Sequence, residues 1–306
     1  MNLPEEFRHF LSDAVSRGEI LAKYNEDLAE LSGFKIGGPA DVVIRPLSLH
    51  ALKTVVGAAR SFGVRYDLFG NCSNLLFSDK GYRGAVILTK NLSGVSVDGN
   101  IIYAECGASL MSVALAAEKA ALSGFEFAYG IPGTVGGAVC MNAGAYGGEI
   151  SDVLLSTDCM SEDGTLKTLS KDECLFGYRH SIYSDRKNHV MSARFNLSPS
   201  DRAEIRAKMD DLMQKRREKQ PLEYPSAGSV FKRYPGYYTA KLIEDAGFKG
   251  LTVGGAQVST KHAGFIINRG GATSADVCEL IAQIKKGIYD REGIEIETEV
   301  IIVPEK

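Results

Sequence analysis

The chain has 306 residues, a net charge of −3 and 44% hydrophobic and 24% charged residues, values typical of soluble globular proteins. This balance excludes the basic domain that marks a nucleic-acid-binding protein. The chain contains no uncharged apolar run that approaches the length of roughly 18 residues needed for a membrane-spanning helix. Its N-terminus lacks the features of a secretory signal. We therefore expect a cytoplasmic protein of two or three domains with reduced thiols.

The first half of the chain predicts alternating helices and strands. The apolar spacing predicts a helix over 4–16, a strand over 41–46 and a helix over 49–62. Strands follow at 64–69, 85–89, 94–97 and 101–104, the last two joined by the hairpin signal Asp98-Gly99-Asn100. A helix over 109–121 completes this half.

The second half begins with strands over 152–161 and 166–169, joined across Glu162-Asp163-Gly164, and a strand over 189–197. Asp201 and Glu204 have the spacing of a capping box at the start of a charged helix that ends at Pro221. A helix over 237–246, strands over 254–258 and 265–268, a helix capped by Thr273 and a strand over 294–303 follow. Without a regular βαβ repeat, the pattern predicts an α+β fold.

Neither the cysteines nor the histidines have metal-ligand spacing. The six cysteines form no CxxC pair, and the five histidines form no HxxxH or HExxH pair. We therefore expect no metal site.

The stretch GIPGTVGGAVCMNAGAYGGEI, residues 130–150, holds seven glycines. Such a density suits backbone that lies against something bulky or turns through positive φ. A surface loop of tight turns is the alternative, but such loops usually carry Ser, Asp, Asn and Lys. Because this stretch instead carries aliphatic residues, we interpret it as a buried surface for a large ligand.

A second segment, FGNCSNLLF (69–77), leaves a predicted strand and enters a turn of small residues. Its backbone N–H groups can converge on an anion, although a plain Asn-Gly-type turn explains the residues equally well. The glycines of the longer stretch do not form the GxGxxG fingerprint. Together the two segments would suit a dinucleotide laid between two loops.

Several side chains outside these segments are candidates for chemistry. Arg179, in GYRHSIY, suits a carboxylate or phosphate clamp, with a surface arginine as the alternative. Ser229, in YPSAGSVFK, lacks the GxSxG elbow of a serine hydrolase. Lys261 and His262 lie at the start of a predicted strand and are candidates for ligand contacts. The alternative is that they are only the solvated end of that strand. Of the glutamates at 295, 297 and 299, Glu299 precedes four apolar residues and is expected in the most buried setting.

In their order along the chain, these segments resemble one family. GFKIGGPADVVI, GNCSNLLF, the glycine-rich stretch, YRHSIY, AGSVFKR, VSTKHAGFIIN and IEIETEV are similar to the flavin-dependent UDP-N-acetylenolpyruvoylglucosamine reductases of bacterial cell-wall synthesis. The resemblance covers nearly the whole chain.

The resemblance implies an α+β fold with a two-part FAD-binding module of the vanillyl-alcohol oxidase type and a C-terminal substrate domain. The module would occupy 1–199, with subdomains at about 1–90 and 91–199, and the substrate domain 200–306. FAD would be bound non-covalently, with backbone N–H groups of the 70–74 turn on its diphosphate. The implied cofactor residues are Gly70, Asn71, Cys72, Ser73, Asn74, Gly130, Ile131, Pro132, Gly133, Val135, Gly136, Gly137, Ala138, Asn142 and Ala145.

The implied reaction is the NADPH-dependent reduction of UDP-N-acetylglucosamine enolpyruvate to UDP-N-acetylmuramate, a peptidoglycan precursor. Ser229 matches the proton donor, and Arg179 and Glu299 match the pair that steadies the substrate carboxylate. An arginine offers a planar, always-charged fork to a carboxylate. Lys232, Arg233, Arg217 and Lys261 are candidates for substrate contacts. No residue pattern separates NADPH from NADH, and we expect a monomer.

Two residues depart from the family pattern, and one further feature indicates which of the family's two forms the chain resembles. Cys72 stands where a glycine is common, which is tolerated if its φ is negative. Ile301 replaces a basic residue often found there. No long insertion lies between Arg179 and Ser229, so the chain resembles the shorter form without a tyrosine-bearing lid loop.

Two alternatives compete with the reductase. A related flavin oxidase would have no evident use for Arg179, Ser229 and Glu299 together, and no covalent flavin-attachment motif is present. A non-catalytic nucleotide-binding protein would be favoured if one of these three residues were lost, and all three are present.

Overall fold

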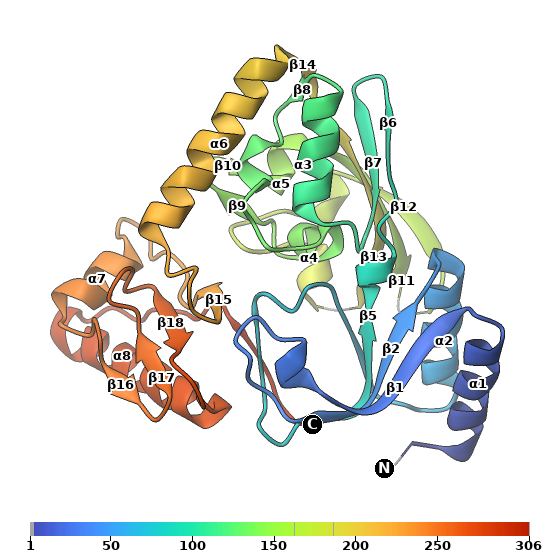
Figure 1. The fold of residues 1–306 in the computed structure, drawn as a ribbon, viewed down its shortest axis with the longest axis horizontal. Helices are drawn as coiled ribbons and strands as arrows, with labels where there is room; N and C mark the ends of the chain where they lie inside the picture. Colours follow the sequence, from blue (N-terminus) through green and yellow to red (C-terminus); the bar gives the residue numbers. More distant parts are fainter. Residues whose placement is uncertain (1–2, 162, 186, 306) are drawn as a thin grey trace. The chain divides into compact units, whose positions relative to one another are not determined.

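A computed structural model describes residues 3–161, 163–185 and 187–305 (Figure 1). Its contacts divide the chain into two compact units. The first contains residues 1–24, 41–71 and 84–215, and the second contains 25–40, 72–83 and 216–306. This division differs from a boundary at residue 200, because two early segments join the second unit and most of the helix that follows residue 201 joins the first.

The first unit is built on a five-stranded antiparallel sheet with strand order β12-β11-β13-β7-β6. Its strands are β6 (Val95–Asp98), β7 (Ile101–Glu105), β11 (Leu154–Ser161), β12 (Leu166–Ser170) and β13 (Asn188–Asn196). The predicted hairpin between β6 and β7 is confirmed, with Gly99 at φ +54° in its turn. Strands β11 and β12 also pair as predicted, although Glu162 of their connection lies outside the described residues.

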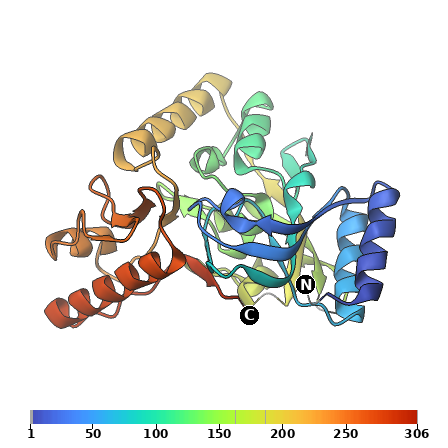
Figure 2. The same cartoon turned by 60° about the horizontal axis from the view of Figure 1, so that its bottom comes forward.

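A second sheet, most of whose residues belong to the first unit, has the order β1-β2-β5-β3, with β3 and β5 parallel. Its strands are β1 (Ile20–Asp27), β2 (Pro39–Pro46), β3 (Tyr66–Phe69) and β5 (Tyr82–Leu88). Helices α1 (Glu5–Ser16) and α2 (Leu49–Ser61) lie side by side, as Figure 2 shows. Ser48 caps α2 by accepting from the Ala51 N–H, which explains why the predicted helix begins where it does.

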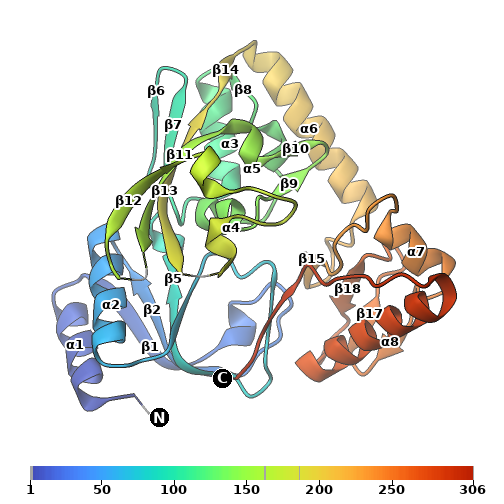
Figure 3. The ribbon, with the colours of Figure 1, turned by 180° about the vertical axis from the view of Figure 1, so that it is seen from behind.

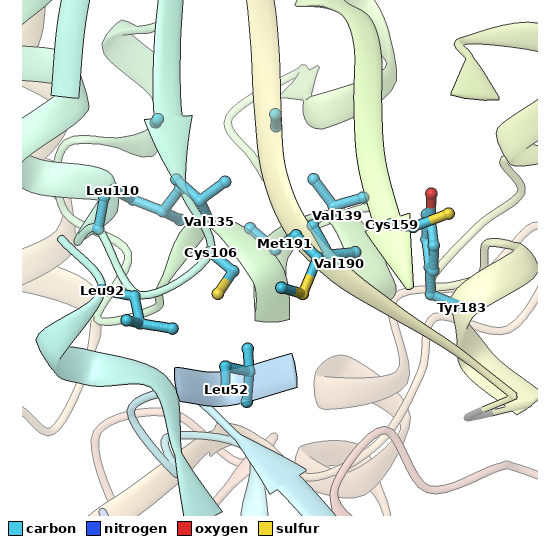
Figure 4. Close-up of a cluster of buried hydrophobic side chains, with 14 of the residues drawn as sticks. Leu52, Leu92, Cys106, Leu110, Val135, Val139, Cys159, Tyr183, Val190 and Met191 are labelled. Carbon is cyan, nitrogen blue, oxygen red and sulfur yellow. The ribbon is translucent and has the colours of Figure 1, made fainter. Parts of the chain in front are cut away.

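One hydrophobic core extends through the first unit. Helices α3 (Leu110–Lys119) and α4 (Val135–Cys140) bury their apolar faces there, together with β7 and β13. In the close-up of Figure 4, Val135 and Val139 of α4 lie with Cys106, Leu110 and Met191 in this cluster. The glycine-rich stretch is thus anchored to the core through α4.

Short elements complete the first unit. They are β8 (Leu122–Ser123), β9 (Gly144–Ala145), β10 (Gly148–Glu149), β14 (Ser198–Pro199), α5 (Ile150–Val153), and the 3₁₀ turns η2 (Thr89–Asn91), η3 (Glu126–Ala128), η4 (Asp172–Cys174) and η5 (Ile182–Asp185). β9 and β10 form a small hairpin that follows α4 directly, and β8 pairs with β14.

Helix α6 (Arg202–Lys219) is held in the first unit by a buried carboxylate. Arg202 Nε lies 2.7 Å from one oxygen of Glu118, and Arg206 Nη2 lies 2.9 Å from the other. The Glu118 side chain is only 6% exposed. The hydrogen bond from Arg202, followed by the charges of both arginines, lowers the pKa of Glu118 below its ordinary value.

This ion pair predicts a pH-dependent stability. Because the folded-state pKa of Glu118 is depressed, its contribution is present above the unfolded-state pKa and is lost as the pH falls through the folded-state value. We expect Glu118→Gln to lower the thermal midpoint by roughly a few degrees at neutral pH, because it leaves two arginines facing a neutral group. Thermal scans from about pH 7 to pH 3 should show the difference from wild type closing at the acid end; a constant difference would contradict the assignment.

The second unit is a four-stranded antiparallel sheet covered by a long helix. The strand order is β15-β18-β17-β16, with bounds β15 (Ser226–Ser229), β16 (Thr252–Val253), β17 (Ala256–Val258) and β18 (Phe265–Asn268). Helix α8 (Ser274–Glu292) packs on β16 and β17, and α7 (Thr239–Asp245) packs on α8 (Figure 3). The capping box of Thr273 and Asp276 that the sequence predicts is confirmed. The turn η1 (Leu28–Glu30) also belongs to this unit.

The final strand is shorter than predicted. β19 covers only Ile301–Val303 and pairs in parallel with β4 (Leu75–Phe77). Ile294 and Ile296 are buried in the core of this unit without belonging to a strand. The alternation of these isoleucines with glutamates therefore indicates one buried face. Ahead of β19, the described backbone pairing of this segment is limited to an isolated antiparallel bridge between Thr298 and Phe231.

Across the described ranges, no helix combines the length and apolar content needed to cross a bilayer. The same ranges contain no group of three or more His, Cys, Asp or Glu side chains placed to hold a metal ion.

Candidate active site

The glycine-rich stretch and the start of the GNCSN turn are neighbours within the first unit. Asn71 Nδ2 donates a hydrogen bond of 2.8 Å to the carbonyl oxygen of Pro132. A Cβ at Gly70 would overlap the hydroxyl of Thr134. The two segments that the sequence pairs as walls of a dinucleotide site therefore contact one another through these residues, while Cys72, Ser73 and Asn74 belong to the second unit.

Some glycines of the stretch are required by the protein itself. A Cβ at Gly136 would lie 3.1 Å from Cys106 Cβ, and a Cβ at Gly148 would lie 2.8 Å from the Phe127 ring. Both positions pack against side chains of the same unit. For them the absence of a side chain needs no ligand.

Gly133 and Gly137 are different, because the protein leaves room for a methyl group at both. A Cβ at Gly133 would meet its nearest neighbour, Leu110, at 3.5 Å, and one at Gly137 would meet Thr134 Oγ1 at 3.6 Å. These are ordinary van der Waals distances, and neither glycine has a positive φ. The protein itself therefore does not require glycine at these two positions, and their open backbone leaves room for a cofactor to lie against it.

Thr134 carries the clearest sign of a polar ligand, although the sequence analysis does not select it. The residue is 3% exposed and precedes α4, yet its hydroxyl caps no N–H of the helix. Among the described residues, Thr134 Oγ1 has no hydrogen-bond partner. An unpaired buried hydroxyl costs roughly 1–3 kcal/mol, so such a group usually has a purpose. The sequence could have indicated this residue, because Thr134 is the one residue with a hydroxyl group in the glycine-rich run 130–137.

The N–H groups of the next residues are occupied within the protein. Val135 N donates to Ala108 O, Gly136 N to Cys106 O and Ala138 N to Thr134 O. Val135 is fully buried in the core. Gly130, Ile131, Gly133 and Ala145 are half-buried, and Pro132 and Gly137 are exposed. These six keep surface that a cofactor can contact, whereas Val135 and Ala138 support α4 from within.

Cys72 does not have the negative φ that would let a cysteine replace glycine in this turn without strain. Its φ is +51°, in the left-handed region, and its side chain is buried. A residue with a Cβ is strained there by roughly 1 kcal/mol relative to glycine. A glycine at this position would adopt the same backbone conformation without that strain.

Asn142 belongs to the glycine-rich stretch, but its side chain is buried and engaged within the protein. It is 1% exposed, and its Nδ2 donates to Glu149 Oε1 at 2.9 Å and to Gly177 O at 3.1 Å. Its Oδ1 accepts from Ser151 N at 3.0 Å. The amide is therefore engaged on both sides within the first unit.

Arg179 sits at the tip of a two-residue turn. Gly177 and His180 exchange backbone hydrogen bonds of 3.0 and 3.2 Å. Arg179 adopts φ +54°, a conformation that suits glycine or asparagine and costs an arginine about 1–2 kcal/mol. Its guanidinium donates to Gly144 O at 3.2 Å and lies 5.0 Å from the centre of the Tyr178 ring.

Ser229 ends strand β15 in the second unit. The strand has a register shift against β18 between Ser226 and Ser229, and Gly228 at φ +74° lies within it. Such a bulge redirects the following side chain. Ser229 is half-buried, and no described residue hydrogen-bonds its hydroxyl.

Glu299 lies beside the end of the Ser229 strand. Its N–H donates to Val230 O at 2.7 Å, and its carbonyl oxygen accepts from Asn74 Nδ2 at 3.1 Å. Glu299 is half-buried while Glu295 and Glu297 are exposed, which confirms the predicted order of burial. The second unit thus brings Ser229 and Glu299 together through Val230, whereas Arg179 belongs to the first unit.

The four substrate candidates all belong to the second unit. Lys232 pairs with Glu297 at 2.8 Å, and its hydrogen bond and charge lower the pKa of that glutamate. Lys261 Nζ donates to the carbonyl oxygen of Arg217 at 2.7 Å, and Arg233 lies 5.5 Å from the centre of the Tyr238 ring.

His262 is held within the same unit. Its Nδ1 accepts from Gly264 N, and burial lowers the pKa of its imidazole. This arrangement agrees with packing rather than substrate binding.

Comparisons with known proteins identify both parts of the chain. A family profile described as "FAD binding domain" matches residues 40–170, and one described as "UDP-N-acetylenolpyruvoylglucosamine reductase, C-terminal domain" matches residues 220–303. The chain is 49% identical to the UDP-N-acetylenolpyruvoylglucosamine reductase of Caldanaerobacter subterraneus subsp. tengcongensis, covering 97% of each chain. It is 46% identical to that of Pediococcus pentosaceus, covering 97% of this chain and 98% of the relative.

The chain belongs to the UDP-N-acetylenolpyruvoylglucosamine reductase family. A solved structure of the family, from Thermus caldophilus, superimposes with a TM-score of 0.80 at 32% identity, over 93% of this chain and 99% of that one. Berberine bridge enzyme shares the fold of the flavin module, with a TM-score of 0.50 at 15% identity over 66% of this chain and 45% of its own. This member of the family is therefore an FAD-dependent oxidoreductase, as the sequence analysis predicts.

The residues of the first unit fit FAD independently of the comparisons with known proteins. Gly133 and Gly137 leave open backbone, and the orphaned hydroxyl of Thr134 lies beside Gly70 and Gly137. A dinucleotide offers both a flat surface and hydrogen-bonding atoms. Gly70, Asn71, Gly133, Thr134 and Gly137 are the first-unit residues that would hold it.

This fit predicts opposite effects of Thr134→Val with and without cofactor. In the apoprotein the isosteric valine removes an unpaired buried hydroxyl, so the free energy of unfolding should rise by up to about 1 kcal/mol. FAD affinity should fall by about tenfold, which corresponds to about 1.4 kcal/mol. Urea unfolding of the apoprotein and a fluorescence titration with FAD measure the two effects. Thr134→Ser should keep wild-type affinity, and unchanged FAD binding by the valine variant would overturn the assignment.

Proposed function

We propose that this chain reduces the enolpyruvyl double bond of UDP-N-acetylglucosamine enolpyruvate with electrons from NADPH, giving UDP-N-acetylmuramate. The observation that carries the proposal is that the catalytic positions of the family, Arg179, Ser229 and Glu299, are all present in a chain that matches reductases over 97% of its length. FAD held by the first-unit residues named above would supply the hydride that reaches C3 of the enolpyruvyl group, with NADPH as the source of that hydride.

Addition of a hydride at C3 places negative charge on C2, conjugated with the carboxylate of the substrate. We assign Arg179 and Glu299 to this carboxylate. The guanidinium of Arg179 can form two parallel hydrogen bonds with it, and the interaction strengthens as charge moves onto the oxygens. Glu299 contributes as a hydrogen-bond donor if its carboxyl group is protonated.

Ser229 supplies the proton that completes the reduction. Its hydroxyl donates a proton to C2, forming a C–H bond, and recovers a proton from water afterwards. Serine is a weak acid, but the acceptor is a strongly basic carbanion, which makes the transfer feasible within hydrogen-bond distance. The absence of a described partner for the Ser229 hydroxyl supports this role, because no protein acceptor has to release it.

An anaerobic titration tests the proposal. The purified, FAD-loaded protein should lose its flavin absorption bands on addition of NADPH and recover them on addition of UDP-N-acetylglucosamine enolpyruvate. A protein that is bleached by NADPH and stays reduced with this substrate would keep the cofactor and refute the substrate. Testing NADH in the same cuvette determines the preferred donor.

A further inference from the structure

We propose that Asn142 and Glu149 are positioning residues that fix the turn carrying Arg179, and that Asn142 does not bind the cofactor. The inference rests on the role proposed above for Arg179. It goes further by naming the residues through which the first unit sets the position of that guanidinium.

The hydrogen-bonding capacity of Asn142 is used inside the protein. A side-chain amide has two N–H donors and one carbonyl acceptor. In Asn142 the donors contact Glu149 Oε1 and Gly177 O, and the acceptor receives the N–H of Ser151. Since Asn142 is 99% shielded from solvent and its donors are both engaged, it has no N–H left for a flavin.

The contact with Gly177 fixes the base of the Arg179 turn. Gly177 is one of the two residues whose mutual backbone bonds close the turn, the other being His180. Its carbonyl oxygen accepts from His180 N as well as from Asn142. The turn is therefore attached to the segment that follows α4 at the residue where it begins.

The opposite end of the arginine is fixed by the same segment. The Arg179 guanidinium donates to the carbonyl oxygen of Gly144 in β9. Gly144 is the register partner of Glu149 in β10, and Glu149 in turn accepts from Asn142. The contacts form a closed ring through Asn142, Gly177, Arg179, Gly144 and Glu149.

Glu149 is itself held rigidly. It caps α5, accepting from the N–H of Asp152, while the Asp152 carboxylate accepts from Glu149 N at 2.8 Å. The hydroxyl of Ser151 also donates to Glu149 Oε1. A carboxylate that accepts several hydrogen bonds in a fixed capping box gives Asn142 a stationary partner.

The ring also explains how an arginine is maintained at φ +54°. The left-handed conformation is unfavourable for this residue and persists only where neighbouring contacts determine it. Asn142, at φ +44°, is a residue type that tolerates the region. Loosening the ring should let the turn relax and displace the guanidinium from the substrate carboxylate.

Asn142→Asp tests the inference, because it preserves shape and the left-handed preference while replacing the donor with an oxygen that faces Glu149 and Gly177 O. We expect reoxidation of reduced enzyme by UDP-N-acetylglucosamine enolpyruvate to slow by about 10- to 100-fold, as small displacements of catalytic groups do. Flavin reduction by NADPH and the Kd for FAD should stay within about threefold of wild type. Stopped-flow absorbance and FAD fluorescence titration give these values.

Two further variants separate a positioning role from a structural one. Asn268→Asp alters another buried amide, one that donates to Phe34 O in the second unit, and should lower stability without slowing one half-reaction selectively. Glu149→Gln keeps one oxygen toward Asn142 and should show the same selective defect at about 2- to 10-fold, which preserves the test if Asn142→Asp folds poorly.

The inference is overturned if Asn142→Asp weakens FAD binding tenfold or more, or slows both half-reactions equally. It is also overturned if reoxidation is unchanged while an Arg179 variant is slow. If Arg179→Asn itself leaves reoxidation unchanged, the failure lies in the proposed role of Arg179 and not in the ring.

Discussion

Ser229→Ala is expected to leave an enzyme that accepts electrons but cannot pass them on productively. General acid catalysis by one positioned group contributes typically about 10²–10⁴-fold, so reoxidation by the enolpyruvyl substrate should slow by about three orders of magnitude. Reduction of the flavin by NADPH requires no proton from Ser229 and should keep its wild-type rate. Single-turnover absorbance measurements of the two half-reactions show the contrast directly.

A matched control lies in the same strand. Ser226 is half-buried at the other end of β15 and is paired with Ile267, as Ser229 is paired with Phe265. Ser226→Ala should change neither half-reaction by more than about twofold. If Ser229→Ala keeps full reoxidation, or if it blocks reduction by NADPH as strongly as reoxidation, Ser229 is not the proton donor.

The fold was predictable wherever a periodic pattern coincided with a local stop signal. Helix α2 begins after Ser48 and helix α8 after Thr273, because hydroxyl caps leave a mark in the sequence. The strand predicted over 294–303 was mostly wrong for the opposite reason. Alternating Ile and Glu reveal that one face is buried, but among the described residues of this segment only β19 forms a strand, and Thr298 adds one isolated bridge to Phe231.

The site was predictable in its motifs and not in the direction of its side chains. A glycine-rich stretch does not disclose that Gly136 is bare because of Cys106 while Gly137 is bare despite having room. Likewise Asn142 reads as a cofactor contact from its motif, although its amide faces Gly177. These distinctions depend on tertiary neighbours, which no local pattern encodes.

Backbone conformation is a further feature that the sequence does not reveal. The local sequence around Cys72 and Arg179 does not indicate a positive φ, because cysteine and arginine normally avoid the left-handed region. In each case a residue occupies a conformation better suited to glycine. At Cys72 the consequence is strain in a turn, and at Arg179 it is a charged side chain displayed at the tip of one.

Arg179→Asn should therefore abolish most of the activity without a matching loss of stability. Asparagine tolerates φ +54°, so relief of backbone strain offsets the lost hydrogen bond to Gly144 O and the lost contact with Tyr178, and the free energy of unfolding should change by less than about 1 kcal/mol. Loss of a preorganised group that stabilises developing charge typically costs about 10²–10³-fold, and reoxidation by substrate should slow by that amount. Urea unfolding and single-turnover kinetics on the same preparation measure both. Tyr178→Phe, which keeps a ring beside the guanidinium, should remain active; an Arg179→Asn enzyme that unfolds in proportion to its lost activity would make Arg179 a structural residue.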